Sequence, residues 1–216
     1  MTVAAEDRAW QAPAGPGRAE VKVRGSRFLA DVQPVNDEKT ATSHLQDLRD
    51  EFPRATHHCW GWRLRSGKDP VERASDAGEP SGTAGTPILR ALQSAGVEGA
   101  SCVVVRWFGG TKLGVGPLAR AYRDAAAAGL LAAGTATCRQ LQIITLTFPH
   151  ELSGEVRRAL SLHRGRILHE DHGAEACLEV GVPMDRVADL CSAVTDASRG
   201  RARLAQRGRI TVQVPS

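Results

Sequence analysis

Residues 106–125 have the sequence RWFGGTKLGVGPLARAYRDA, a glycine-rich segment that joins two very different stretches of chain. The preceding residues, ASCVVVRW (100–107), predict a buried strand, and residues 117–133 predict an alanine-rich helix that ends at Gly134. A strand, a glycine loop and a helix N-terminus in this order are typical of a phosphate site. The loop contains Lys112 and four glycines, namely Gly109, Gly110, Gly114 and Gly116.

This loop does not fit the familiar nucleotide-binding motifs. A Walker A loop places its lysine after the last glycine, whereas Lys112 precedes the last two. The segment GVGPLA (114–119) satisfies G-x-G-x-x-[GA], but the strand is expected to end near Trp107, and no acid follows about twenty residues on. A dinucleotide site is therefore not expected.

The charges around the loop favour a negative partner. Arg120 and Arg123 lie near the start of the predicted helix, Lys112 precedes them, and the first acid is Asp124. Because a helix N-terminus is itself partly positive, this arrangement attracts an anion. Two partners remain open, an external phosphate or the acids of the chain's own loop at residues 66–85: Asp69, Glu72, Asp76 and Glu79.

Composition sets broad limits. The chain has 216 residues, 42% hydrophobic and 24% charged, which is ordinary for a soluble globular protein. No segment approaches the ~18 apolar residues of a membrane span, and residues 1–20 lack the apolar core of a secretory signal, so the cytoplasm is expected and a membrane partner is not. The net charge of +4 permits a nucleic-acid partner without arguing for one. The five cysteines are widely spaced and predict neither disulfides nor a zinc site.

The pattern along the chain predicts two domains of α+β class. Residues 1–18 are expected to form a flexible tail, residues 19–135 a two-layer α/β domain, and residues 139–216 a ferredoxin-like βαββαβ domain. In the first domain we expect a helix capped by Asn36, an extended segment at 57–65, and a polar loop at 66–85.

Other chemical groupings are weaker. His57, His58, Asp76 and Glu79 could be assembled into a metal site on paper, but adjacent histidines on a strand point to opposite faces, so a strand-face histidine hydrogen-bonded to a loop carboxylate is favoured. We expect no metal and no cofactor. Cys59 is merely near the histidines, and Ser81 lacks the first glycine of G-x-S-x-G. No catalytic constellation emerges.

A second basic patch is predicted at residues 198–209, SRGRARLAQRGR. Arg199, Arg201 and Arg203 alternate and would line one face of an extended segment, where they would follow a phosphate backbone. A solvated hairpin or edge strand, whose charge deters pairing with other chains, explains the same pattern and is slightly favoured.

Four segments together resemble the Impact family and its bacterial YigZ-like members over about residues 20–134: GSRFLADV (25–32), ATHHCWGWRL (55–64), ASDAGEPSGTAGTPIL (74–89) and VVRWFGGTKLGVGPLARAY (104–122). The resemblance implies a first domain folded like the second domain of a small-subunit ribosomal protein, also seen in elongation factor G. It also implies a second domain like that factor's C-terminal ferredoxin-like module. Eukaryotic members of the family regulate translation during amino-acid starvation through protein contacts.

The resemblance also implies a signature in two parts. The first part falls on Asp76, Gly78, Glu79, Pro80, Ser81, Gly82, Thr83 and Gly85, and the second on Arg106, Gly109, Gly110, Lys112, Leu113, Gly114, Gly116, Arg120 and Tyr122. The chain departs from the family at Trp107, where tyrosine is usual, and at Pro117, where glycine is usual. Pro117 stiffens the helix entry and removes one N–H donor.

Three functional hypotheses follow. The first is a non-enzymatic, translation-associated regulator that binds RNA, a ribosome or a translation-factor partner. Its contact would be the basic glycine loop: Arg106, Gly109, Gly110, Lys112, Gly114, Gly116, Arg120 and Arg123, beside a signature loop with His57, Asp76, Glu79, Ser81 and Thr83. The second is an enzyme on a small phosphorylated or nucleotide substrate in a cleft between residues 76–85 and 106–120, with Asp76 or Glu79 as base and Lys112 as phosphate anchor. The third is a pure protein-interaction module.

Overall fold

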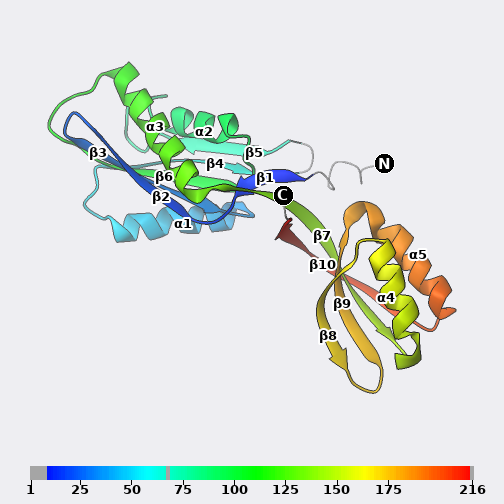
Figure 1. Ribbon diagram of the computed structural model, residues 1–216. Helices are drawn as coiled ribbons and strands as arrows, with labels where there is room; N and C mark the ends of the chain where they lie inside the picture. The colour runs from blue at the N-terminus through cyan, green and yellow to red at the C-terminus, as the bar shows by residue number, and fades with distance from the viewer. Residues whose placement is uncertain (1–8, 67–68, 215–216) are drawn as a thin grey trace. The chain divides into compact units, whose positions relative to one another are not determined.

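The computed structural model describes residues 9–66 and 69–214. These fall into two compact units, Trp10–Thr137 and Cys138–Val214 (Figure 1). Each unit combines helices with an antiparallel sheet, which confirms the predicted α+β class.

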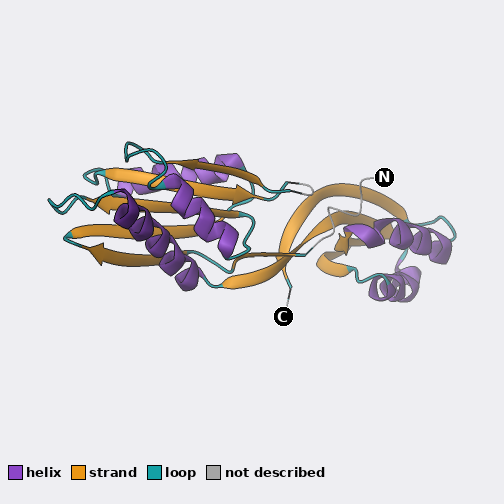
Figure 2. Ribbon diagram, turned by 90° about the horizontal axis from the view of Figure 1, so that it is seen from above, coloured by secondary structure: helices purple, strands orange, loops and turns teal. Residues whose placement is uncertain are grey.

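The first unit is built on a five-stranded sheet with the order β2-β3-β6-β4-β5. Its strands are β2 (Gly17–Val23), β3 (Ser26–Pro34), β6 (Ala100–Trp107), β4 (His57–Leu64) and β5 (Val71–Ser75), and each neighbouring pair is antiparallel. Figure 2 shows these strands side by side, with helices over them. The predicted break near Gly25 is the tight turn between β2 and β3, where Gly25 has a φ of +83°.

The sequence of the central strand β6 is apolar throughout because helices cover both of its faces. Helices α2 (Gly85–Ser94) and α3 (Val115–Ala133) cover one face of the sheet, and α1 (Glu38–Glu51) covers the other (Figure 1). Cys102 and Val104 pack beneath α2 and α3, while Val103 and Val105 pack against α1. The predicted two layers are therefore three, because the periodicity of a helix does not say which face of a sheet it covers.

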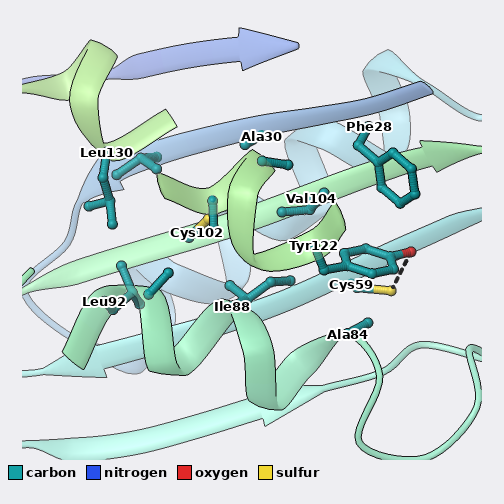
Figure 3. Packing of buried hydrophobic residues seen from close by; sticks show 14 of the residues in the cluster. Phe28, Ala30, Cys59, Ala84, Ile88, Leu92, Cys102, Val104, Tyr122 and Leu130 are labelled. Atoms are coloured by element: carbon teal, nitrogen blue, oxygen red, sulfur yellow. Dashed lines mark hydrogen bonds between the residues drawn. The ribbon is translucent and has the colours of Figure 1, made fainter. Parts of the chain in front are cut away.

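The larger core of this unit lies between the sheet and the pair α2 and α3. Figure 3 shows Ile88 and Leu92 of α2 and Tyr122 of α3 packed over Phe28 and Val104 of the sheet. Phe28 and Tyr122 meet edge to face with ring centroids 5.1 Å apart. All five side chains are excluded from solvent, so the helix that follows the glycine loop is fixed firmly on the sheet.

Three local predictions are wrong. Residues 10–18 are not a flexible tail, because β1 (Trp10–Pro13) is anchored by the buried Trp10, whose ring lies 4.1 Å from the Arg65 guanidinium carbon. The N-cap of α1 is Asp37 instead of Asn36, since Asp37 forms a reciprocal capping box with Thr40. The polar loop at 66–85 contains the edge strand β5, whose polar residues are tolerated at an edge. The remainder of the predicted tail, residues 1–8, lies outside the described residues.

The second unit has the predicted ferredoxin-like order. Its elements are β7 (Thr135–Phe148), η1 (His150–Leu152), α4 (Ser153–Leu162), β8 (Arg166–His172), β9 (Ala176–Pro183), η2 (Met184–Arg186), α5 (Val187–Ser198) and β10 (Arg203–Gln213). Antiparallel pairing gives the strand order β10-β7-β9-β8. Alternate residues of β7 and β9, such as Ile144 and Val180, face α4 and α5 in one apolar core.

Candidate functional site

Strand register brings two predicted site residues, His57 and Arg106, together with Phe28 at one end of the sheet of the first unit. Arg106 at the end of β6 pairs with His57 on one side and with Phe28 on the other. Residues directly opposite one another on neighbouring strands share a face, so all three lie under the loop before α2 and the start of α3. His58 lies on the opposite face, as predicted, where burial lowers its pKa.

Glu79 forms a buried ion pair with Arg106. Their side chains are only 4% and 5% exposed, and Arg106 Nη1 donates to Glu79 Oε1 at 2.5 Å. The Tyr122 hydroxyl donates to the same oxygen at 2.7 Å, and His57 Nε2 lies 3.8 Å away. The second guanidinium nitrogen of Arg106 donates to Ser26 Oγ at 3.3 Å. One carboxylate thus joins the loop at 76–85 to β6 and α3.

Asp76 stabilises its own loop. Its carboxylate accepts hydrogen bonds from the backbone N–H groups of Gly82, Ala84 and Gly85, at 2.8 to 2.9 Å. Burial pushes its pKa upward, but the three N–H groups outweigh burial and hold the pKa of Asp76 below its usual value. Since the last two donors belong to the start of α2, Asp76 caps this helix from a distance.

The remaining members of the signature loop have local roles. Thr83 is buried and donates from its hydroxyl to the Pro80 carbonyl at 2.6 Å. Ser81 is exposed. His57 uses Nδ1 to donate to the Ala77 carbonyl at 3.0 Å, which leaves Nε2 on the side of Glu79. The predicted hydrogen bond between a strand histidine and a loop carboxylate is therefore wrong, because His57 Nε2 lies 3.8 Å from Glu79 Oε1 and the hydrogen bond of His57 goes to a backbone carbonyl.

Cys59 is a structural thiol. It donates to the Asp76 carbonyl at 2.9 Å and lies 3.3 Å from the Tyr122 hydroxyl, as Figure 3 shows for the latter contact. Burial raises its pKa to about 12, and burial likewise raises the pKa of Tyr122 above its usual value. A thiol that stays protonated at neutral pH is a poor nucleophile.

The basic residues of the glycine loop divide into two groups. Arg106 is held by Glu79, and Arg123 contacts its neighbour Asp124 at 3.0 Å. Lys112 and Arg120 are exposed, and neither side chain makes an ion pair or hydrogen bond with any residue in the described part of the chain. The chain's own acids therefore do not neutralise these two charges, which answers the question that the sequence left open.

The four glycines are required to different degrees. A Cβ atom on Gly109 would lie 2.0 Å from the Gly25 carbonyl carbon, so the loop packs directly on the β2–β3 turn. Gly110 and Gly114 have φ values of +83° and +81°, a conformation that favours glycine. Gly116 has neither constraint. The Gly109 N–H donates to Ser26 Oγ at 3.2 Å, which fixes the start of the loop beside Arg106.

A pocket of about 390 Å³ opens between the two signature loops. Its lining includes polar residues, namely Thr56, His57, Glu79, Arg106 and Lys112, and apolar residues or glycine, namely Pro80, Phe108, Leu113, Gly114, Val115 and Leu118. Phe108 is 46% exposed although it is a large apolar residue. Sequence reasoning missed Phe108, and its position between the strand and the glycines was the available signal.

The second basic patch is partly compensated. Arg201 contacts Glu151 at 2.5 Å, and Arg203 contacts Glu175. Arg199 is the left-handed C-cap of α5 and is exposed. These arginines belong to the second unit, and their role in nucleic-acid binding stays a prediction.

A buried serine–histidine–aspartate cluster also escaped the sequence analysis. His44 Nδ1 lies 3.0 Å from Ser101 Oγ, and its Nε2 lies 2.9 Å from Asp31 Oδ1, while Arg18 donates to the other oxygen of Asp31. Ser101 is 0% exposed, so no substrate reaches its hydroxyl. The cluster instead satisfies the polar groups between α1 and the sheet.

Two structural features are absent from residues 9–66 and 69–214, a metal cluster and a membrane-spanning helix. No group of three His, Cys, Asp or Glu side chains there has an arrangement that would hold a metal ion. Among the helices that the structure describes, none has the length and apolar character needed to cross a bilayer.

Comparisons with known proteins match both units. The model of the Impact N-terminal domain matches residues 24–130, and that of a domain of unknown function, DUF1949, matches residues 146–201. The chain is 34% identical over 197 residues to the IMPACT family member YigZ of Escherichia coli K12, covering 90% of this chain and 96% of that protein. It is 36% identical to an IMPACT family member of Thermus thermophilus, with 83% of this chain and 97% of that protein covered.

A solved structure shows the same fold. The crystal structure of a protein described as hypothetical is 31% identical in sequence and superposes with a TM-score of 0.67. The match covers 91% of this chain and 96% of the other.

Proposed function

Because this chain belongs to the IMPACT family, we propose that it is a non-enzymatic, cytoplasmic regulator of translation that binds RNA through the loop between β6 and α3. Membership of the family supports a regulatory, translation-associated role at the level of the family. The RNA contact is our proposal from the geometry of the site. The protein would bind this RNA on a ribosome or together with a translation factor.

The observation that carries this proposal is the pair of unneutralised cations at the end of the sheet. Asp76 is occupied by backbone N–H groups and Glu79 by Arg106, so the adjacent acids leave Lys112 and Arg120 uncompensated. Exposed cations without a local partner attract phosphate and release its counterions on binding.

The exposed ring of Phe108 supports single-stranded RNA in particular. It lies in the same loop as Lys112, and both line the pocket. Proteins that bind single strands combine a cationic surface with aromatic side chains on which bases stack. The loop offers both within five residues of sequence.

The enzyme hypothesis gains a pocket from the structure, but neither of the two carboxylates that it names as the base is suited to that role. Asp76 has a lowered pKa and accepts three N–H groups, and Glu79 is bound by Arg106 and Tyr122. A general base must be free to take a proton. The Asp76 carboxylate is not, because its three N–H donors occupy it, and the charge of Glu79 is compensated by Arg106, so binding without catalysis is the better account of this site.

The test is the affinity of the full chain for single-stranded RNA at a series of salt concentrations, measured by fluorescence anisotropy. For single strands, log K falls with log[salt] with a slope of about −0.7 per phosphate contact. We expect a salt-dependent affinity that Lys112→Ala and Arg120→Ala each weaken, with a shallower slope.

Lys39→Ala is the matched control, because Lys39 is an exposed lysine on α1, on the other side of the sheet. It should bind RNA as the unmodified chain does. The proposal is wrong if the chain does not bind RNA at low salt, or if Lys112→Ala and Lys39→Ala have the same affinity.

A further inference from the structure

The pocket beside Lys112 has the size and the lining of a small-ligand site. Its volume of about 390 Å³ lies in the range of sites that enclose a small molecule. Such sites are mostly apolar, with a few polar groups that orient the ligand. The question is which ligand the polar groups of this pocket would recognise.

One polar group is a carboxylate oxygen without a donor. Arg106 and Tyr122 both donate to Oε1 of Glu79. Oε2 accepts no hydrogen bond from any residue within 9–66 and 69–214, although the side chain is 4% exposed and lines the pocket. Oε2 is not among the fully buried side-chain atoms that lack a partner, so solvent reaches it, and a ligand hydroxyl or amino group can donate to it in place of water.

The glycine loop on the pocket lining favours a ligand group of the opposite kind, an anion. Lys112 has no partner, and α3 begins at Val115 with no acid in its first turn and no side-chain cap. The positive charge of Lys112 is thus added to the free N–H groups of a helix start. Both favour an anion, and the charge of Glu79 does not repel it strongly because Arg106 compensates that charge.

The rest of the pocket lining is largely apolar. Leu113 and Leu118 form its buried part, while Phe108 and Val115 are exposed at its edge. An exposed aromatic ring at the mouth of a pocket is a surface on which a flat ring stacks.

We propose that this pocket holds one nucleotide. In this arrangement the ribose 2′-hydroxyl, which is free both in a mononucleotide and within an RNA strand, donates to Glu79 Oε2, the base stacks on Phe108, and the phosphate binds Lys112 and the start of α3. The inference rests on the proposed function when the nucleotide belongs to an RNA strand. A free mononucleotide has the same chemistry and is the other source.

The experiment measures dissociation constants of the full chain by calorimetry for three probes: uridine 5′-monophosphate, its 2′,3′-dideoxy analogue and a single-stranded oligouridylate. Because Glu79 holds a buried ion pair, the hydroxyls are removed from the ligand and Glu79 is left intact. We expect the monophosphate to bind and the dideoxy analogue to bind at least 10-fold more weakly. Phe108→Ala and Lys112→Ala should each weaken the monophosphate at least 10-fold, whereas Lys39→Ala should not.

The probes separate the two sources of the nucleotide. Oligouridylate that binds at least 100-fold more tightly than the monophosphate identifies RNA as the ligand. Equal affinities support the pocket and identify a free nucleotide, which overturns the RNA proposal alone.

Two outcomes overturn the pocket. One is a dideoxy analogue that binds as well as the monophosphate. The other is RNA binding that depends on Lys112 but is unchanged in Phe108→Ala, which leaves the proposed function standing without a nucleotide in the pocket. Absence of binding by all three probes overturns both proposals.

Discussion

The buried contact between Glu79 and Arg106 makes a quantitative prediction for Glu79→Gln. Glutamine has nearly the same shape and keeps an acceptor for the Tyr122 hydroxyl, but it removes the negative charge. Arg106 then stays charged, because a guanidinium does not lose its proton in a protein, and its side chain is only 5% exposed.

The expected loss follows from this burial. Removing one partner of a buried ion pair destabilises a protein by about 3–5 kcal/mol. Arg106 keeps Ser26 as a partner and lies 5.2 Å from the Phe28 ring, so we expect the lower end, about 3 kcal/mol. With a urea m-value of about 2 kcal/mol per molar, the midpoint falls by about 1.5 M.

Tryptophan fluorescence during urea unfolding measures this change in the right part of the chain. All four tryptophans, Trp10, Trp60, Trp62 and Trp107, belong to the first unit. Their signal therefore follows the unit that contains Glu79, whatever the second unit does.

The double variant Glu79→Gln with Arg106→Met is the decisive control. It removes the unpaired charge as well, and replacing both members of a buried pair is far milder than removing one. The double variant should therefore be more stable than Glu79→Gln alone. The reasoning is refuted if Glu79→Gln costs less than about 1 kcal/mol, or if the double variant is the less stable of the two.

Three further predictions concern the same end of the sheet. Gly109→Ala should destabilise the first unit by about 1–3 kcal/mol or more, because its Cβ would lie 2.0 Å from the Gly25 carbonyl carbon. Gly116→Ala is the control and should not destabilise it, because its Cβ would have no atom within 4 Å. Equal urea midpoints for the two variants would contradict this prediction. Asp76→Ala should cost about 1–2 kcal/mol. Because the pKa of Asp76 is lowered in the folded state, its contribution is present above about pH 4 and is lost as the pH falls through the folded value, so the variant should show a shallower loss of stability with acid. Cys59, with a pKa of about 12, should resist iodoacetamide at pH 8 in the folded chain and react in urea, as peptide mapping by mass spectrometry would show; alkylation in the folded chain would refute its burial.

Local sequence was a good guide where one interaction of short range decides the outcome. The apolar run at 100–107 became β6, and the order of elements after Thr135 became the ferredoxin-like unit. Local sequence gave wrong predictions where a contact between residues far apart in the chain decides the structure. Trp10 anchors a segment expected to be flexible, and β5 forms in a polar stretch because the neighbouring β4 offers it a free edge.

The candidate site shows the same division. The sequence placed Lys112 and Arg120 at a helix start, and it predicted that His57 and His58 would separate. It did not find Phe108 or the hydrogen bonds of Tyr122, and it left open whether Glu79 or an outside anion would bind the basic residues. That choice depends on distances between side chains from β6, α3 and the loop before α2, which no local pattern contains.

The sequence by itself determined the class of fold, the glycine loop and the sign of its charge, because these follow from periodicity, from backbone freedom and from counting. Only the tertiary structure decided which charges remain free. Strand register sets Arg106 beneath Glu79, the backbone N–H groups of α2 occupy Asp76, and Lys112 and Arg120 lie beyond the reach of both acids. A buried carboxylate binds the nearest donors that folding brings to it, and those donors came from three separate elements.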